Sequence, residues 1–388
     1  MAERSVNQPG LPTDYYAPDY RIEIEGQELD PKSKGDILEV KVVMDMENMT
    51  SFELNVNNWD DKTFFFKYSD KPTDPKQVTY DLGNRVHVKM GYAGNLLSMA
   101  RGQITTLAPK FPESGSPTIS ISGLDGMLKL RDRKPTDKDI KKFVNQSDSD
   151  IATIIGQRNG LDVKVTKTTE KHDLVVQKNQ DDAQFIMERA KRIDFDCFVQ
   201  TDPDSGKDTL YFVKPTDGRS SDKIRVYEFE WGKNLINFSP QLTISRQVSK
   251  VTVRGWSAEL KDVFEYTAEP KDLPGGGGGG TKGTSGPEAA EKQLNGKQEV
   301  VVDAPVTSQE EAKKLAISLL AERAYEFITG SGQVIGLPDL RPGDNVFLKN
   351  LGKRFSGEYY VKKVEHNLGN NGYTTNFDVR RVYDGESK

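Results

Sequence analysis

The sequence predicts an α+β fold that is mainly β. Three features lead there: runs with alternating apolar and polar residues at both ends of the chain, a middle section with helical spacing, and a weak repeat between the two strand-rich ends. The chain has 388 residues. That is long for one domain, so we expect more than one folding unit.

The first strand-rich section begins after an N-terminal arm. Residues 1–17 contain prolines and no periodic pattern, so we expect an arm that only a partner would order. From Tyr20 the runs alternate with period two between Gly, Pro and Asn-rich turns: YRIEIEG, DILEVKVVMDM, SFELNVN, RVHVKMG, RGQITTL and PTISISG. Residues 18–134 are therefore predicted to form an antiparallel sheet curled into a small β-barrel.

The middle section, residues 135–240, is predicted to be an inserted α/β unit. Ser147 and Asp150 resemble a capping box before one helix, and Gly160 stops it. A second helix follows in QDDAQFIMERAKRIDFD, with Phe185 and Arg189 on its apolar side, and CFVQTDPDSGKDTLYFV reads as a hairpin.

The last section, residues 241–388, is predicted to return to strands and to contain a third helix. A Gly-rich tract at 270–298 reads as a mobile loop or linker, and a capping box from Ser308 to Glu311 begins the helix. Strands VFLK, VKKV and TNFDV here match VHVK, ITTL and TISI of the first section in spacing. Any two antiparallel sheets share some of this pattern, so spacing alone leaves open whether the barrel is duplicated.

Composition excludes several classes of protein. The net charge is −5, and its 54 basic and 59 acidic residues are interspersed without a basic stripe for nucleic acid. No apolar run is long enough to span a membrane, and the first residues lack the apolar segment of a signal peptide, so synthesis in the cytoplasm is expected. The single cysteine, Cys197, excludes a disulfide within one chain and is expected to pack as a small buried hydrophobe.

A search for motifs with chemistry predicts no catalytic residue, no cofactor and no metal site. The glycine run lacks the strand and helix of a dinucleotide site, and no P-loop is present. DPDSGKD at Asp202 has its glycine one place too early for a calcium loop and is better explained as a turn. His87, His172 and His366 have no second ligand at metal spacing. These observations favour a scaffold or binding module over an enzyme.

Longer stretches resemble one known family. EFEWGKNLINFSPQLTISRQVSKVTVRGW, SDSDIATIIGQRNGL, DDAQFIMERAKRIDFDCFV and GEYYVKKVEHNLGNNGYTTNFDVRR are similar, in order and spacing, to the phage late control gene D family of baseplate central hub proteins. The resemblance covers about residues 18–383. Its signature residues, all structural, are Phe185, Arg189, Trp231, Gly232, Asn234, Leu235, Gly255, Trp256, Gly357, Tyr359, Val361, His366, Gly372, Tyr373 and Phe377.

The resemblance implies a trimeric hub with two similar small antiparallel β-barrel domains per chain and an inserted α/β unit. Such a ring of six barrels would join a six-fold inner tube to a three-fold spike in a contractile tail or injection system. The implied partners are two further copies of the chain, a separate trimeric spike protein, the hexameric inner tube protein, baseplate wedge proteins, and a tape-measure protein or cargo. The alternatives are a tail-tip peptidoglycan-degrading enzyme and a carbohydrate-binding module.

Overall fold

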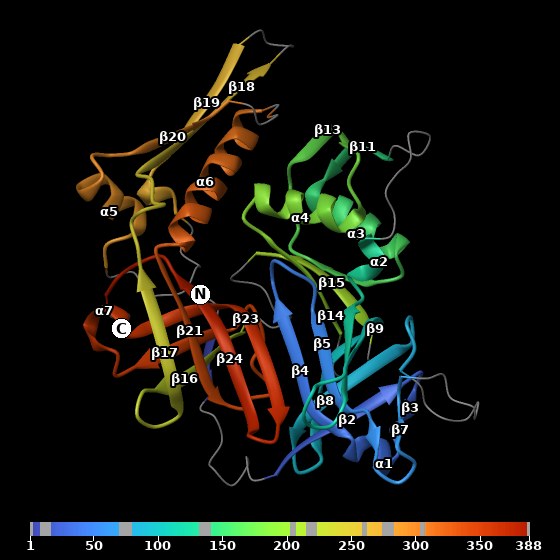
Figure 1. Cartoon of the computed structure of the whole chain (residues 1–388). Helices are drawn as coiled ribbons and strands as arrows, with labels where there is room; N and C mark the ends of the chain where they lie inside the picture. Colours follow the sequence, from blue (N-terminus) through green and yellow to red (C-terminus); the bar gives the residue numbers. More distant parts are fainter. Residues whose placement is uncertain are drawn as a thin grey trace.

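The computed structural model places two β-sheets side by side, with two smaller α/β units lying on one side of them (Figure 1). It describes residues 3–7, 17–69, 80–131, 141–201, 207–214, 223–257, 262–273, 283–302, 306 and 308–385. Among these residues the two sheets share hydrogen bonds and together form one 14-stranded sheet. The mainly β fold with an inserted α/β unit is confirmed.

The first sheet has the strand order β4-β5-β10-β9-β8-β2-β3. Its strands alternate buried and exposed side chains because one face covers a core of Val, Ile, Leu, Met and Phe. A short helix, α1 (Pro31–Gly35), and a two-stranded hairpin, β6 (Trp59–Asp60) with β7 (Phe65–Phe66), accompany it. The strands are β2 (Pro18–Ile24), β3 (Gln27–Glu28), β4 (Ile37–Asp45), β5 (Ser51–Asn57), β8 (Arg85–Tyr92), β9 (Asn95–Lys110) and β10 (Thr118–Asp125).

The second sheet has the order β17-β21-β24-β23-β22-β16-β1 and covers its own apolar core. The short helix α7 (Gly352–Phe355) connects β22 to β23. The strands are β1 (Glu3–Asn7), β16 (Lys223–Glu230), β17 (Leu235–Leu242), β21 (Ile328–Ile335), β22 (Asn345–Lys349), β23 (Gly357–Gly369) and β24 (Gly372–Arg381).

The two sheets repeat one another in detail. Strands β17, β21, β24, β23 and β22 occupy the places that β4, β5, β10, β9 and β8 occupy in the first sheet, in the same order along the chain. Both sheets carry an extra residue at matching points: Leu38 in β4 corresponds to Ile236 in β17, and Thr105 in β9 corresponds to Lys362 in β23. Because bulges disrupt a ladder and are positional features, their coincidence establishes the register of the duplication. The outer strands differ, since β16 runs parallel to β22 whereas β2 runs antiparallel to β8.

The inserted α/β unit follows the first sheet. Ser147 caps α3 in a full capping box with Asp150, as predicted, and Gly160 has a φ of 71° just beyond its end. Residues Phe143 and Phe185 stack at 5.7 Å inside its core. The unit comprises α2 (Leu128–Arg131), β11 (Lys141–Ser147), α3 (Asp148–Arg158), β12 (Asp162–Val165), β13 (Lys171–Gln177), α4 (Asp182–Arg192), β14 (Asp196–Thr201) and β15 (Asp208–Val213).

A further unit, which the sequence assigned to the second barrel, lies between β17 and β21. Its strands form a separate three-stranded sheet, β19-β18-β20, packed against α6 over a core of its own. A period-two pattern fits any half-buried sheet, so it could not tell these strands from barrel strands. The elements are β18 (Lys250–Ser257), β19 (Asp262–Ala268), the 3₁₀ turn η2 (Pro270–Asp272), α5 (Gly286–Gln293), β20 (Gln298–Val301) and α6 (Gln309–Tyr325).

Four smaller expectations need correction. Residues 3–7 of the N-terminal arm form β1, which pairs in parallel with β16 of the same chain. The tract at 270–298 includes α5, which starts with a capping box from Ser285 to Glu288, while residues 274–282 lie outside the described part. Strand β16 and most of β17 lie within the predicted range 135–240, but both belong to the second sheet and not to the inserted unit. The dipeptide Asn371-Gly372 predicts the β23–β24 turn at residues 371–372, whereas the turn consists of residues 370–371, because Gly369 pairs with Gly372.

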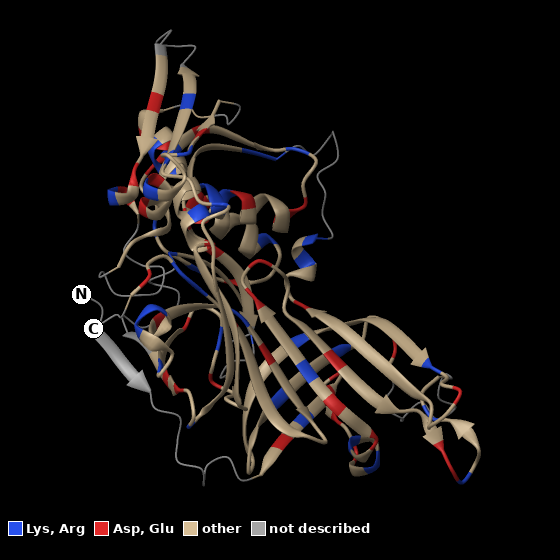
Figure 2. Ribbon diagram, turned by 60° about the vertical axis from the view of Figure 1, so that its left-hand side comes forward, with Lys and Arg blue, Asp and Glu red and all other residues tan. Residues whose placement is uncertain are grey.

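Charges of both signs are scattered over the ribbon in every part of the molecule (Figure 2). No helix in the described part of the chain is long and apolar enough to cross a membrane.

Candidate functional site

The two sheets are joined by a strand ladder between β23 and β4, and this joint is the candidate functional site. The ladder is antiparallel and runs from Lys363 opposite Asp45 to Gly369 opposite Glu39. It contains two apolar pairs: Val364 lies opposite Met44, and Leu368, opposite Val40, packs into the core of the first sheet. Because these strands also belong to separate cores, the ladder fixes one sheet against the other.

Arg341, in the loop between β21 and β22, makes hydrogen bonds to the backbone of both sheets at this joint. Its side chain is 6% exposed, and its guanidinium donates to the carbonyl oxygens of Leu340 and Ser98, both at 3.1 Å. Ser98 lies on β9 of the first sheet, so one buried cation holds backbone from both sheets. The Tyr92 hydroxyl of the first sheet also donates to the Gly336 carbonyl, just beyond the end of β21, at 2.8 Å.

His366 is fully buried in the same joint. Its Nε2 lies 3.2 Å from the Leu340 carbonyl, which can only accept, so the proton is on Nε2. Its Nδ1 then accepts from the hydroxyl of Tyr373 at 3.0 Å. Burial, with the nearby Arg341 charge, holds the pKa of His366 well below its usual value. A neutral histidine with both nitrogens engaged is a structural group.

A second joint lies where α4, α6 and β24 meet. The Arg380 guanidinium lies 3.7 Å from the ring centre of Tyr325 and 4.9 Å from that of Tyr360. The Tyr325 hydroxyl donates to Asp194 at 2.8 Å and the Tyr360 hydroxyl donates to Asp196 at 2.5 Å. A cavity of about 110 Å³ lies beside them, lined in part by Glu322 and Cys197.

This second joint is expected to make stability depend on pH. Burial raises the pKa of Asp194 from 3.8 to about 6, although the Tyr325 hydrogen bond acts against the shift. Between these values the folded chain keeps a proton that the unfolded chain has released, so stability falls as pH rises. We expect a loss of about 1 to 3 kcal/mol from pH 4 to pH 7 because of this group.

Urea unfolding of the wild type and of Asp194→Asn at several pH values checks this expectation. The amide keeps the acceptor for Tyr325 but cannot ionise, so the variant should lose this part of the pH dependence. Parallel stability curves for the two proteins would contradict the assignment to Asp194.

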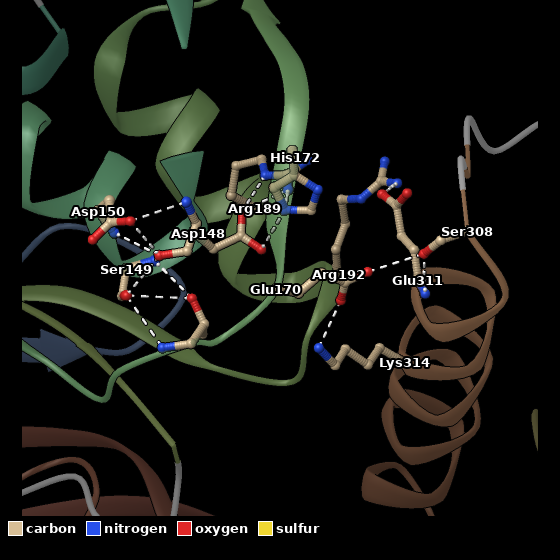
Figure 3. A network of polar contacts seen from close by, with 12 residues as sticks. Asp148, Ser149, Asp150, Glu170, His172, Arg189, Arg192, Ser308, Glu311 and Lys314 are labelled. Carbon is tan, nitrogen blue, oxygen red and sulfur yellow. Dashed lines mark hydrogen bonds and ion pairs between the residues drawn. The ribbon is translucent and has the colours of Figure 1, made fainter. Parts of the chain in front are cut away.

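A polar network connects the inserted unit to helix α6 (Figure 3). At its centre Asp148 accepts from the Arg189 Nε at 2.6 Å and lies 3.2 Å from the Nε2 of His172. Burial favours the neutral form of Asp148, yet the His172 hydrogen bond and the Arg189 charge hold its pKa below the usual value. Arg189 is thus an internal partner of Asp148 at the start of α3.

The same network reaches α6 through ion pairs. Glu170 accepts from the Ser308 hydroxyl at 3.0 Å and from the Lys314 ammonium at 2.6 Å (Figure 3). Arg192 of α4 pairs with Glu311 at 2.8 Å. Ser308 caps α6 as predicted, and the Glu311 carboxylate is engaged with α4. These contacts tie the two outer units to each other.

Ser98, His87 and Glu23 are arranged like the serine, histidine and carboxylate of a catalytic triad. His87 lies 2.9 Å from the Ser98 hydroxyl and 3.3 Å from Glu23. Burial, together with the Arg101 and Lys89 charges, lowers the pKa of His87 to about 4. An open cleft of about 520 Å³ is lined by Glu23 and His87 but not by Ser98, which is 7% exposed. The serine therefore lacks access for a substrate from this cleft.

Within the described residues, no group of three or more His, Cys, Asp or Glu side chains is placed to hold a metal ion.

The structure gathers several of the predicted signature residues at the second sheet and separates the others. Tyr359, Val361, His366, Tyr373 and Phe377 are buried in β23 and β24, and Leu235 is buried at the start of β17. Gly232 has a φ of 89° in the β16–β17 turn, where the Asn234 side chain donates to the Glu228 carbonyl. Trp231 and Trp256 are exposed. The remaining residues lie at the start of β23 and β24 (Gly357, Gly372), in β18 (Gly255) and in α4 (Phe185, Arg189).

Sequence reasoning missed Arg341, Arg380, Asp194 and Asp196. A charged residue in a polar stretch is usually exposed, and nothing local distinguishes these four. The only sequence signal near Arg341 is the turn dipeptide Pro342-Gly343, which indicates a loop and not a buried cation.

Comparison with known proteins gives a family and a fold. The family model described as Alg8 N-terminal domain matches residues 16–370. The chain belongs to the Alg8 N-terminal domain family. That description names a domain and no activity, and it is not the late control gene D family that the sequence resembles. No curated protein matches the sequence.

Several solved structures share the fold of this Alg8 N-terminal domain protein at low sequence identity. A 43 kDa tail protein of prophage MuSo2 from Shewanella oneidensis is 17% identical, with 94% of this chain and 98% of that chain covered and a TM-score of 0.67. A tail protein from Neisseria meningitidis is 14% identical, with 96% and 100% covered and a TM-score of 0.66. An E. coli component of the type VI secretion system is 12% identical, with 95% and 78% covered and a TM-score of 0.55. The fold is that of phage tail proteins.

Proposed function

We propose that this protein is the structural central hub of a contractile phage tail or contractile injection system baseplate. The observation that carries the proposal is the duplicated sheet: one chain holds two sheets with the same strand order and the same bulges, joined side by side. Three copies would present six similar sheets in a ring. Such a ring can bind a six-fold tube on one side and a three-fold spike on the other.

The fold shared with tail proteins from two bacteria and with a secretion component supports the same role. In this proposal the first sheet (residues 18–125) and the second sheet (residues 223–242 and 328–381) supply the two tube-like domains, residues 128–213 supply the insertion, and the buried signature residues hold these parts together. The partners are the inner tube protein, a separate trimeric spike protein, the baseplate wedge proteins, and a tape-measure protein or cargo. The protein itself catalyses no reaction.

The mass of the purified protein in solution tests the proposal. Light scattering is expected to give about 130 kDa, three times the chain mass of 43.4 kDa, and images of the particle should contain a ring with six similar lobes. The measurement should be made with and without the spike protein of the same particle. A 43.4 kDa monomer under both conditions would contradict the hub and favour a carbohydrate-binding module.

A further inference from the structure

The ladder between β23 and β4 has a counterpart in the repeat. It consists of two strand edges that correspond to these two but are not paired in the described structure. The ladder between β23 and β4 uses the half of β23 beyond the extra residue Lys362. The matching half of β9, beyond Thr105, pairs with β10 on one edge, and no described strand pairs with its other edge. Strand β17, the counterpart of β4, pairs only with β21 among the described strands. One chain therefore carries, on different sheets, the two open edges that another ladder of this kind needs.

The bulges define how these open edges would align. Extra residues Thr105 and Lys362 relate β9 to β23, and extra residues Leu38 and Ile236 relate β4 to β17. When the internal pairs are transferred in this way, Val364 opposite Met44 becomes Leu107 opposite Leu242. Leu368 opposite Val40 becomes Phe111 opposite Phe238. Both transferred pairs are apolar, as the internal ones are.

Burial distinguishes the closed joint from the open one. At the closed joint Leu368 is 8% exposed and Val40 is 0% exposed; Phe111, the counterpart of Leu368, is 60% exposed, and Phe238, the counterpart of Val40, is half-buried. Phe111 also contacts the ring of Phe66 at 5.2 Å, and Phe66 lies beside the exposed Phe64 and Phe65 of the β6–β7 hairpin. An exposed cluster of large aromatic side chains at the end of an open strand edge is typical of a protein interface.

We propose that the open edge of β9 in one copy of this chain joins β17 of a second copy, head to tail, in the register of the internal joint. Because the two edges lie on different sheets, the contact is heterologous, and repeating it closes a ring of three chains. In Figure 1, β17 lies on the left flank of the paired sheets and β9 lies on the right, as a head-to-tail contact requires. The proposal deepens the proposed function and rests on it for the number of chains.

Two prolines mark these edges. Pro109 and Pro240 face each other in the transferred register, and neither has an N–H to donate. This rung therefore lacks hydrogen bonds, and the joint depends on the apolar pairs Leu107–Leu242 and Phe111–Phe238 on either side of it. Proline on an exposed edge also prevents indiscriminate strand pairing. The internal joint has an ion pair between Lys41 and Glu365, whose counterparts Ser239 and Ala108 are uncharged.

Engineered disulfides test the register. In the proposed register Ala108 of one copy lies opposite Gln241 of the next, and both residues are exposed. They form a non-hydrogen-bonded pair, whose Cα atoms lie about 4.5 Å apart, within disulfide range. Under mild oxidation the double variant Ala108→Cys with Gln241→Cys should give covalent species of two and three chains and no larger ones on a non-reducing gel. Co-expression of the two single variants should give only a covalent pair. The native Cys197 is buried and is present in all samples, so the wild-type protein gives the background level of cross-linking.

The matched control is Ala108→Cys with Asn237→Cys, in which the second cysteine lies four residues, roughly 13 Å, along the same strand. It should cross-link at least ten-fold less. If light scattering gives a trimer but the 108–241 pair does not cross-link, or cross-links no better than the control, this joint is wrong and the hub stands. If the protein is a monomer that does not cross-link, both proposals fail. Cross-linking of Ala108→Cys to itself, or a ladder beyond three chains, overturns the closed head-to-tail ring.

A second variant gives an independent measurement. Phe111→Asp should weaken trimer formation at least ten-fold in a dilution series, because it places a charge in the apolar rung. The control Ile154→Asp changes an exposed side chain of α3 and should leave the trimer intact. Equal dissociation of the two variants would overturn the role of Phe111.

Discussion

Replacing Arg341 with alanine is expected to lower the free energy of unfolding by about 3 kcal/mol. The variant removes a buried cation that donates to the carbonyls of Ser98 and Leu340, and only the Leu340 oxygen keeps another side-chain partner, the Nε2 of His366. Hydrogen bonds from a charged group contribute about 1.5 to 3 kcal/mol, and the loss of the bond to the Ser98 carbonyl also removes a contact between the two sheets. Urea unfolding followed by tryptophan fluorescence measures the change.

The control for this variant is Arg246→Ala. The Arg246 side chain is 75% exposed and pairs with Glu326 at 3.3 Å, so its loss should change stability by less than about 0.5 kcal/mol. A loss below about 1 kcal/mol for Arg341→Ala would mean that the strand ladder alone holds the two sheets together.

Replacing Asp148 with alanine is expected to cost about 3 to 5 kcal/mol, the usual result of removing one partner from a buried ion pair. The carboxylate accepts from Arg189 and lies beside His172, and the Arg189 guanidinium would be left buried without its counter-charge. Because α3 and α4 meet at this point, the inserted unit should unfold before the sheets. Hydrogen exchange of α3 and α4 amides locates the loss.

A double-mutant cycle separates the pair from its surroundings. Arg189→Met with Asp148→Ala removes both charges and should recover part of the stability, because no unpaired charge remains. The exposed pair Arg254 and Glu265 is the matched control, and its removal should cost less than about 1 kcal/mol. Additive effects of the two buried substitutions would contradict the coupling of Asp148 to Arg189.

Local features of the fold followed from the sequence. Period-two runs located β4, β5, β8, β9 and β10 because a half-buried strand needs that alternation. Helices α3 and α6 begin at the predicted caps Ser147 and Ser308, since a side-chain oxygen there satisfies a free N–H of the first turn. The glycine-rich composition of residues 270–298 predicts a linker, but a capping box at Ser285 begins α5 within it.

The candidate site was harder to predict. The repeat of strand spacing hinted at two barrels, but the agreement of their bulges appears only when each strand has its partner. Arg341 and Asp194 carry no local signal, because burial of a charge depends on groups that the fold brings from elsewhere in the chain. Their partners Ser98 and Tyr325 are more than a hundred residues away.

The sequence by itself determined most strands of the two sheets, the starts of α3 and α6, and that one chain repeats a strand-rich pattern. These properties depend on side chains within a few residues of one another. Only the tertiary structure decided that β23 pairs with β4, that β18 and β19 leave the second sheet, and that Arg341 is buried. The physical reason is that an alternating strand can pair with many others, and long-range packing selects the partner.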